Sequence, residues 1–200
     1  WWKEYGVLND YFARLSLVLS QGRQENGWLI LEPTTSLWLH YTNVSGGKPL
    51  WDIANDFQAL LGALERGQME YDLGCEDIMA DCGSVGRKCL RVGQARYHTV
   101  VLPAKTENLE SRTFQLMRDF ASSGGRIIAL GLPDYVDGEE SAELQAFMQS
   151  DAVIKMQTPQ EILSLYRQEA DLLVQCPENS HVYHYRCRYE DGQLLFLTNS

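Results

Sequence analysis

Residues 99–130 read TVVLPAKTENLESRTFQLMRDFASSGGRIIAL, and this stretch decides the fold. It opens on the apolar run Thr99–Leu102, which Pro103 ends, and it closes on a second apolar run at Arg126–Leu130. Apolar residues recur at helical spacing between the two runs, and Gly124-Gly125 is a typical helix stop. Two buried strands joined by one helix predict a right-handed crossover and therefore a parallel sheet.

The same alternation of strands and helices extends in both directions along the chain. The apolar run Trp28–Leu31 predicts a strand buried on both faces, and Thr158-Pro159-Gln160-Glu161 is a capping box with proline at the first helical position. We therefore expect a three-layer α/β domain whose central parallel sheet has the strand order 2-1-3-4-5. The other expected elements are helices over 1–22, 50–66 and 139–149, short strands over 69–73 and 152–156, a helical turn over 75–81 and a hairpin over 90–102.

Residues 179–200 depart from this alternation. Val182–Arg188 and Gln193–Leu197 flank Glu190-Asp191-Gly192, a pattern typical of an antiparallel hairpin that begins a β-rich neighbour. The expected organisation is an N-terminal helix at 1–24 packing on the domain, an α/β domain at 25–178 and the hairpin at 179–200. The chain opens without Met and closes in an expected strand, which favours a segment of a longer polypeptide.

Composition and charge exclude several classes of protein. Hydrophobic residues make up 44% of the 200 residues and charged residues 22%, a balance that disordered chains do not show. The apolar runs are strand-sized, well short of the roughly 20 residues that span a bilayer. The net charge of −10 repels nucleic acid and anionic lipid, and no basic cluster offsets it. The glycines fit neither a dinucleotide fingerprint nor a P-loop, so no cofactor is expected.

Seven motifs occur together in this sequence: Tyr11-Phe12-Ala13-Arg14-Leu15-Ser16, Leu19-Ser20-Gln21-Gly22-Arg23, Leu31-Glu32-Pro33, Tyr71-Asp72-Leu73-Gly74 with Glu76, Leu90-Arg91-Val92-Gly93, Val100-Val101-Leu102-Pro103 and Gly124-Gly125-Arg126-Ile127. Together they resemble the flavodoxin-like middle domain of large bacterial glycoside hydrolases. That domain is related in fold to class I glutamine amidotransferases and occurs as the trimerisation domain of family 42 β-galactosidases. The motifs of this sequence are most similar to those of α-L-rhamnosidase-like proteins. The resemblance implies that catalytic carboxylates lie on a separate (β/α)₈ barrel.

The candidate nucleophiles and metal ligands do not have the positions or the spacing that an amidotransferase site or a metal site requires. A class I amidotransferase needs a cysteine on the turn after a core strand, and the corresponding turn at 102–105 has none. His181, His184 and Cys187 are spaced so that successive members lie on opposite faces of a strand, which predicts ordinary sheet residues and no metal site. The cysteines are Cys75, Cys82, Cys89, Cys176 and Cys187. They form no Cys-x-x-Cys pair, which favours reduced thiols and a cytoplasmic location.

The densest acidic cluster follows the second expected strand and consists of Asp72, Glu76, Asp77 and Asp81. Paired carboxylates can hydrolyse a glycosidic bond, so Asp72 and Glu76 are the candidates for a hydrolytic site within this chain. Acidic residues also favour the first turn of a helix, and helix capping with a solvated face is the interpretation we prefer. We therefore expect no catalytic residue in this chain.

The loop after the first strand lies where doubly wound sheets meet ligands and partners, at the carboxyl ends of the strands. Aromatic rings beside carboxylates and hydroxyls suit sugar recognition, because the ring face packs against sugar C–H groups. We nevertheless favour contact with a catalytic barrel over direct contact with sugar. The residues expected to gather at this edge are Trp38, His40, Tyr41, Asp134 and Tyr135, with Thr34, Thr35 and Lys105 beside them.

The expected function is that of a non-catalytic accessory domain of a multidomain glycoside hydrolase. It would support the catalytic barrel and contribute to oligomer contacts or to the rim of the sugar-binding cleft. Its expected partners are the barrel and β-sandwich of the same polypeptide, a second copy of the chain, and carbohydrate near the cleft, but neither nucleic acid nor a membrane. The alternatives are a domain with its own hydrolytic carboxylates and an independent carbohydrate-binding module.

Overall fold

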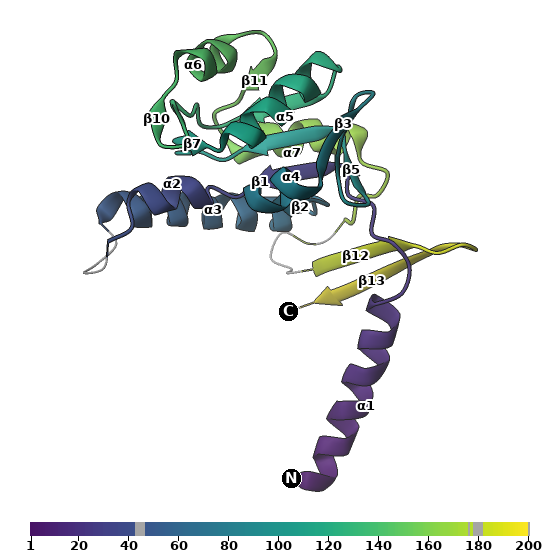
Figure 1. Ribbon diagram of the computed structural model, residues 1–200. Coiled ribbons are helices and arrows are strands. Elements are labelled where there is room, and N and C mark those ends of the chain that lie inside the picture. The colour runs from purple at the N-terminus through teal and green to yellow at the C-terminus, as the bar shows by residue number, and fades with distance from the viewer. Residues whose placement is uncertain (43–46, 176, 178–181, 200) are drawn as a thin grey trace. The chain divides into compact units, whose positions relative to one another are not determined.

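A computed structural model describes residues 1–42, 47–175, 177 and 182–199. The chain divides into two compact units. One unit is Asn26–Pro177, and the other combines residues 1–25 with residues 178–200. Figure 1 shows the elements of both units.

The unit Asn26–Pro177 is built on a sheet of five parallel strands. Their spatial order is β11-β8-β6-β1-β2, so the predicted order 2-1-3-4-5 along the chain is confirmed. The three central strands carry the longest apolar runs, as burial on both faces requires. The five strands are β1 (Trp28–Leu31), β2 (Asp72–Gly74), β6 (Thr99–Leu102), β8 (Arg126–Ala129) and β11 (Val153–Lys155).

Helices cover both faces of this sheet, which gives three layers (Figure 1). Alternate residues of β1 divide between the faces, with Leu29 and Leu31 in one apolar core and Trp28 and Ile30 in the other. The first core is completed by α4 (Glu76–Cys82), α5 (Ser111–Ser122) and α6 (Ala142–Gln149), and the second by α3 (Lys48–Arg66) and α7 (Pro159–Glu169). The predicted α/β class is therefore confirmed.

Short elements supplement the five-stranded sheet. β3 (Gly83–Gly86), β4 (Cys89–Val92) and β5 (Ala95–Tyr97) form an antiparallel meander, which contains the predicted hairpin. β7 (Asn108–Leu109), β9 (Tyr135–Val136) and β10 (Glu139–Glu140) form a second small sheet, so the helix expected from Glu139 begins only at Ala142. α2 (Thr34–Leu39) was not expected, because its residues read as a loop.

The other unit contains α1 (Trp2–Leu19) and the hairpin of β12 (Val182–Arg188) and β13 (Gln193–Asn199). The predicted antiparallel hairpin is confirmed. The Tyr189 hydroxyl donates to the Val18 carbonyl at 3.0 Å, and the Arg23 N–H donates to the Arg188 carbonyl at 2.8 Å. These contacts join residues 1–25 to β12. Among the described helices, none combines the length and hydropathy needed to cross a membrane.

Candidate functional site at the carboxyl edge of the sheet

The carboxyl ends of β1, β2 and β6 lie at one edge of the sheet, because the three strands are parallel neighbours. From this edge the chain continues into α2, α4 and the turn before β7. Doubly wound sheets meet their ligands at this edge. The side chains that follow these strands are therefore the candidate functional residues.

Glu76 is the centre of a buried polar network at this edge, with only 3% of the residue exposed. Its Oε1 accepts a hydrogen bond from the Thr35 hydroxyl at 2.7 Å, and its Oε2 accepts one from the Glu110 backbone N–H at 2.7 Å. Burial raises the pKa of the Glu76 carboxyl, although both hydrogen bonds favour the charged form. The interpretation of Glu76 as part of a solvated face is wrong, whereas Asp77 and Asp81 are exposed as expected.

Ser36 of α2 and Asn108 of β7 lie at the same edge. The Ser36 hydroxyl oxygen accepts hydrogen bonds from the backbone N–H groups of Glu107 at 2.9 Å and Asn108 at 3.0 Å. The Asn108 side-chain oxygen accepts from the Gly138 N–H at 2.8 Å. Ser36 and Asn108 are both buried, so these bonds fasten α2 to β7 and β7 to the turn after β9.

Carboxylates of the chain itself occupy the N-terminus of α5. Glu76 accepts the Glu110 N–H, and Asp137 Oδ1 accepts the Ser111 N–H at 2.9 Å. Burial and the neighbouring carboxylates of Glu76, Asp77 and Asp137 raise the pKa of Glu110. A helix N-terminus beside a parallel sheet is a common anion site, and here two of its N–H donors already bond to acidic side chains.

The turn between β6 and β7 presents Lys105 at the carboxyl edge. Lys105 has φ +58°, a left-handed conformation unusual for a residue with a side chain. Gly131 packs directly on this turn, since a Cβ there would lie 2.7 Å from the Pro103 carbonyl oxygen. Lys105 Nζ lies 2.7 Å from Asp56 Oδ2, and this hydrogen bond raises the pKa of the lysine. The amine is therefore held protonated, which makes it a poor nucleophile.

His40, Trp38 and Tyr41 all lie at the end of α2, as the sequence predicted for this edge. His40 Nε2 lies 2.7 Å from Glu107 Oε2, which ties the end of α2 to the turn before β7. Trp38 is 62% exposed and Tyr41 66% exposed, and Leu39 between them is 47% exposed. We call Trp38, Leu39 and Tyr41 the aromatic surface. Its three side chains are exposed at the carboxyl edge and can contact a partner.

Asp134 and Tyr135 reach this edge through backbone pairing with Glu107. Both of their N–H groups donate to the Glu107 carbonyl at 3.0 Å. Both side chains are exposed. The structure thus brings the loop 133–137 to the same residue that binds His40. The sequence predicted that the loop and His40 share this edge, but not that Glu107 joins them.

Asp72 lies at the opposite end of β2 from Glu76, because β2 begins at Asp72 and ends at Gly74. Its Oδ1 accepts from the Asn26 side-chain amide at 2.6 Å, and its Oδ2 accepts from the Tyr97 hydroxyl at 2.7 Å. Burial, together with the Asp72 carboxylate, raises the pKa of Tyr97. The structure therefore does not bring Asp72 and Glu76 together as a pair of hydrolytic carboxylates.

The remaining candidates from the sequence stay dispersed. Cys75 precedes α4, Cys82 ends it and Cys89 begins β4, so they do not share one helix face. His184 and Cys187 lie on β12, whereas His181 and Cys176 are outside the described residues. Within the described ranges, no group of three His, Cys, Asp or Glu side chains could hold a metal ion.

Sequence reasoning missed the residues that lock the edge, namely Ser36, Asp56 and Asn108. The run Thr34-Thr35-Ser36 after Pro33 was a usable signal, because hydroxyl side chains next to a strand end often bond neighbouring backbone. Asp56 gave no such signal, because its partner Lys105 lies far away in the sequence.

Comparison of the chain with protein-family models, curated proteins and solved structures found no match.

Proposed function

We propose that this chain is a non-catalytic accessory domain of a multidomain glycoside hydrolase, with a flavodoxin-like fold of the class I glutamine amidotransferase type. The strand order 2-1-3-4-5 and the C-terminal hairpin support this proposal, as does the sequence resemblance. One observation carries it. The carboxyl edge holds its buried carboxylate in structural hydrogen bonds, while it exposes the aromatic surface.

The acidic residues favour a structural role over catalysis. A general acid or base must reach a substrate oxygen within hydrogen-bonding distance. Glu76 is buried with both oxygens occupied by Thr35 and Glu110, and Asp72 has both oxygens occupied by Asn26 and Tyr97. Neither carboxylate is free to act on a glycosidic bond in this conformation.

The aromatic surface is the proposed contact with the catalytic barrel of the same polypeptide. Burying a large aromatic side chain removes apolar area from water at about 25 cal/mol per Å², so Trp38 and Tyr41 offer substantial binding energy. The hydrogen bond between His40 and Glu107 holds the end of α2 in place beside them. This combination of fixed backbone and exposed rings is typical of an interface anchor.

The experiment uses the hydrolase polypeptide that contains this domain. We expect Trp38→Ala and Tyr41→Ala to weaken the contact between domain and barrel, measured as a lower temperature of inactivation of the glycosidase. Ile154→Ala is the matched control. Ile154 is an apolar side chain that is 42% exposed, and it lies on β11, the edge strand at the opposite end of the strand order from β2. Equal behaviour of Trp38→Ala and Ile154→Ala would refute the proposed contact.

A role at the rim of the sugar-binding cleft is a second candidate, favoured by the His40 and Glu107 polar pair beside exposed rings. Aromatic rings with polar neighbours bind sugars by stacking and hydrogen bonding. Trp38→Ala would then raise KM for the glycoside while the inactivation temperature stays unchanged. A barrel contact predicts the reverse pattern.

A further inference from the structure

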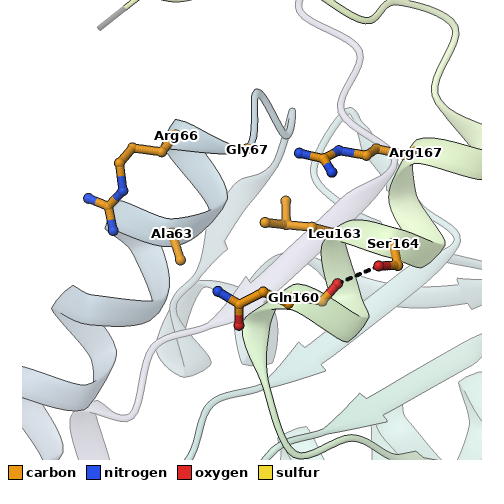
Figure 2. Close-up of a pocket in the computed structure, with 7 residues that line it drawn as sticks. All are labelled: Ala63, Arg66, Gly67, Gln160, Leu163, Ser164 and Arg167. Carbon is orange, nitrogen blue, oxygen red and sulfur yellow. Dashed lines mark hydrogen bonds between the residues drawn. The ribbon is translucent and has the colours of Figure 1, made fainter. Parts of the chain in front are cut away.

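A groove of about 490 Å³ lies between α3 and α7, on residues that the carboxyl-edge site does not use. One stripe of each helix lines it: Ala63, Arg66 and Gly67 at the end of α3, and Gln160, Leu163, Ser164 and Arg167 along α7 (Figure 2). The small residues of α3 create the space. A Cβ at Gly67 would lie 2.3 Å from the Leu163 side chain, so a larger residue would collide with the floor of the groove.

The lining of this groove is rich in hydrogen-bond donors and contains no acidic residue, although the chain has a net charge of −10. Arg66 and Arg167 carry guanidinium groups, and Gln160 adds a side-chain amide. Within the part of the chain that the structure describes, neither arginine forms an ion pair. Three acidic residues near them in the sequence have other partners: Glu65 bonds with Tyr71, Glu161 with Thr158, and Glu169 with Arg126.

We propose that this groove binds a small phosphate-bearing molecule, with its phosphate held by Arg66, Arg167 and Gln160. The planar guanidinium group matches phosphate oxygens with two parallel hydrogen bonds. Leu163 provides an apolar floor for the carbon part of the ligand. Figure 2 shows Arg66 turned back along α3, so binding includes a rotamer change of this exposed side chain, a motion of nanoseconds or less. The site is separate from the proposed accessory function and does not depend on it.

The test is isothermal titration of the 200-residue chain with inorganic phosphate, and with acetate at the same ionic strength. We expect saturable binding of phosphate that is at least about tenfold tighter than binding of acetate. Arg66→Gln and Arg167→Gln should each weaken phosphate binding about tenfold, because each removes a charged donor. Arg87→Gln is the matched control, because Arg87 is exposed and lies in the turn between β3 and β4.

A second measurement keeps the proposal testable if a variant fails to fold. Phosphate should shift the backbone amide resonances of residues 63–67 and 160–167 in the unmodified chain, and leave the meander β3–β5 unchanged. The proposal is overturned by the absence of saturable phosphate binding, by equal affinity for acetate, or by an equal loss in Arg87→Gln. In the first case, the two arginines only complement the C-terminal ends of α3 and α7.

Discussion

The two edges of the parallel sheet use polar side chains in different ways. At the amino edge, Asp72 joins Asn26 and Tyr97, and the Arg126 guanidinium pairs with Glu169 and lies over the ring of Trp28, which is 2% exposed. At the carboxyl edge, both oxygens of Glu76 are likewise occupied, but the aromatic side chains lie outside this network and are exposed. A closed edge only stabilises the fold, whereas an edge with exposed rings also offers a surface for a partner.

The largest effect expected from a polar side chain is the loss of Glu76. Glu76→Ala removes the acceptor of the Glu110 N–H and leaves the Thr35 hydroxyl with the more distant Asn108 carbonyl at 3.3 Å. We expect the free energy of unfolding to fall by about 3 kcal/mol, since each buried unpaired donor costs about 1 to 3 kcal/mol. Urea unfolding followed by circular dichroism measures it. A loss below about 1 kcal/mol would show that water replaces the carboxylate, which would contradict the closed network.

A smaller effect is expected at the amino edge from Asp72→Ala. This substitution frees the Asn26 amide and the Tyr97 hydroxyl, but Asp72 is itself partly exposed and water can reach the vacated position. We expect a loss of about 2 kcal/mol in the same urea experiment. Asp72→Asn serves as the control, because it keeps an acceptor for the Tyr97 hydroxyl. If Asp72→Ala costs more than Glu76→Ala, the comparison of the two edges is wrong.

The two edges also predict opposite responses of stability to pH. Burial raises the pKa of Glu76 above its ordinary value of 4.5, so the folded chain takes up this proton at a higher pH than the unfolded chain does. Lowering the pH through the window between the raised value and 4.5 therefore increases the free energy of unfolding. The hydrogen bond from Arg126 lowers the pKa of Glu169, so its stabilisation is present above 4.5 and is lost as the pH falls below it.

Urea unfolding of two variants over a series of pH values tests these signs. In Glu76→Gln, the free energy of unfolding should no longer rise as the pH is lowered toward 4.5. In Glu169→Gln, it should fall less steeply as the pH is lowered below 4.5. Each variant is compared with the slope of the unmodified chain, so a change in absolute stability does not affect the result. An unchanged slope above pH 4.5 in Glu76→Gln would show that this carboxyl titrates normally.

The smallest expected effect on stability comes from the aromatic surface. Trp38→Ala should change the free energy of unfolding of the chain by less than about 0.5 kcal/mol, because the side chain is largely exposed. Trp28→Ala is the contrasting variant at the amino edge, and it should cost about 3 kcal/mol or more because this ring is buried. A large loss of stability in Trp38→Ala would mean that this ring supports the fold itself.

Local sequence patterns were enough to predict the central strands of the sheet. They did not predict the bounds of β2 or the presence of α2. The apolar runs at 28–31, 99–102 and 126–130 predict β1, β6 and β8, because strands buried on both faces leave a continuous signal. The edge strand expected at 69–73 lies instead at Asp72–Gly74, after a left-handed turn at Gln68 with φ +62°. α2 was missed because its first residues are poor helix formers, and Thr35 and Ser36 hold it through distant partners.

The candidate site was predictable to the same extent. The rule that parallel strands end at one edge placed Trp38, His40 and Tyr41 there. It did not reveal that Glu76 is buried, because an acidic residue at a helix start looks the same in a solvated and in a buried site. The partner that distinguishes the two cases, Thr35, lies 41 residues away. Tertiary contacts of this kind are not encoded in local spacing.

The most direct test of the accessory role is hydrolysis of nitrophenyl glycosides, including the α-L-rhamnoside and the β-D-galactoside, by the purified 200-residue chain. The account predicts no turnover above the rate of the uncatalysed reaction for any glycoside, while the chain is folded by circular dichroism. Turnover by the chain alone that is lost in Asp72→Ala or Glu76→Gln would contradict it, because the reaction would then take place on carboxylates that we assign to structural hydrogen bonds.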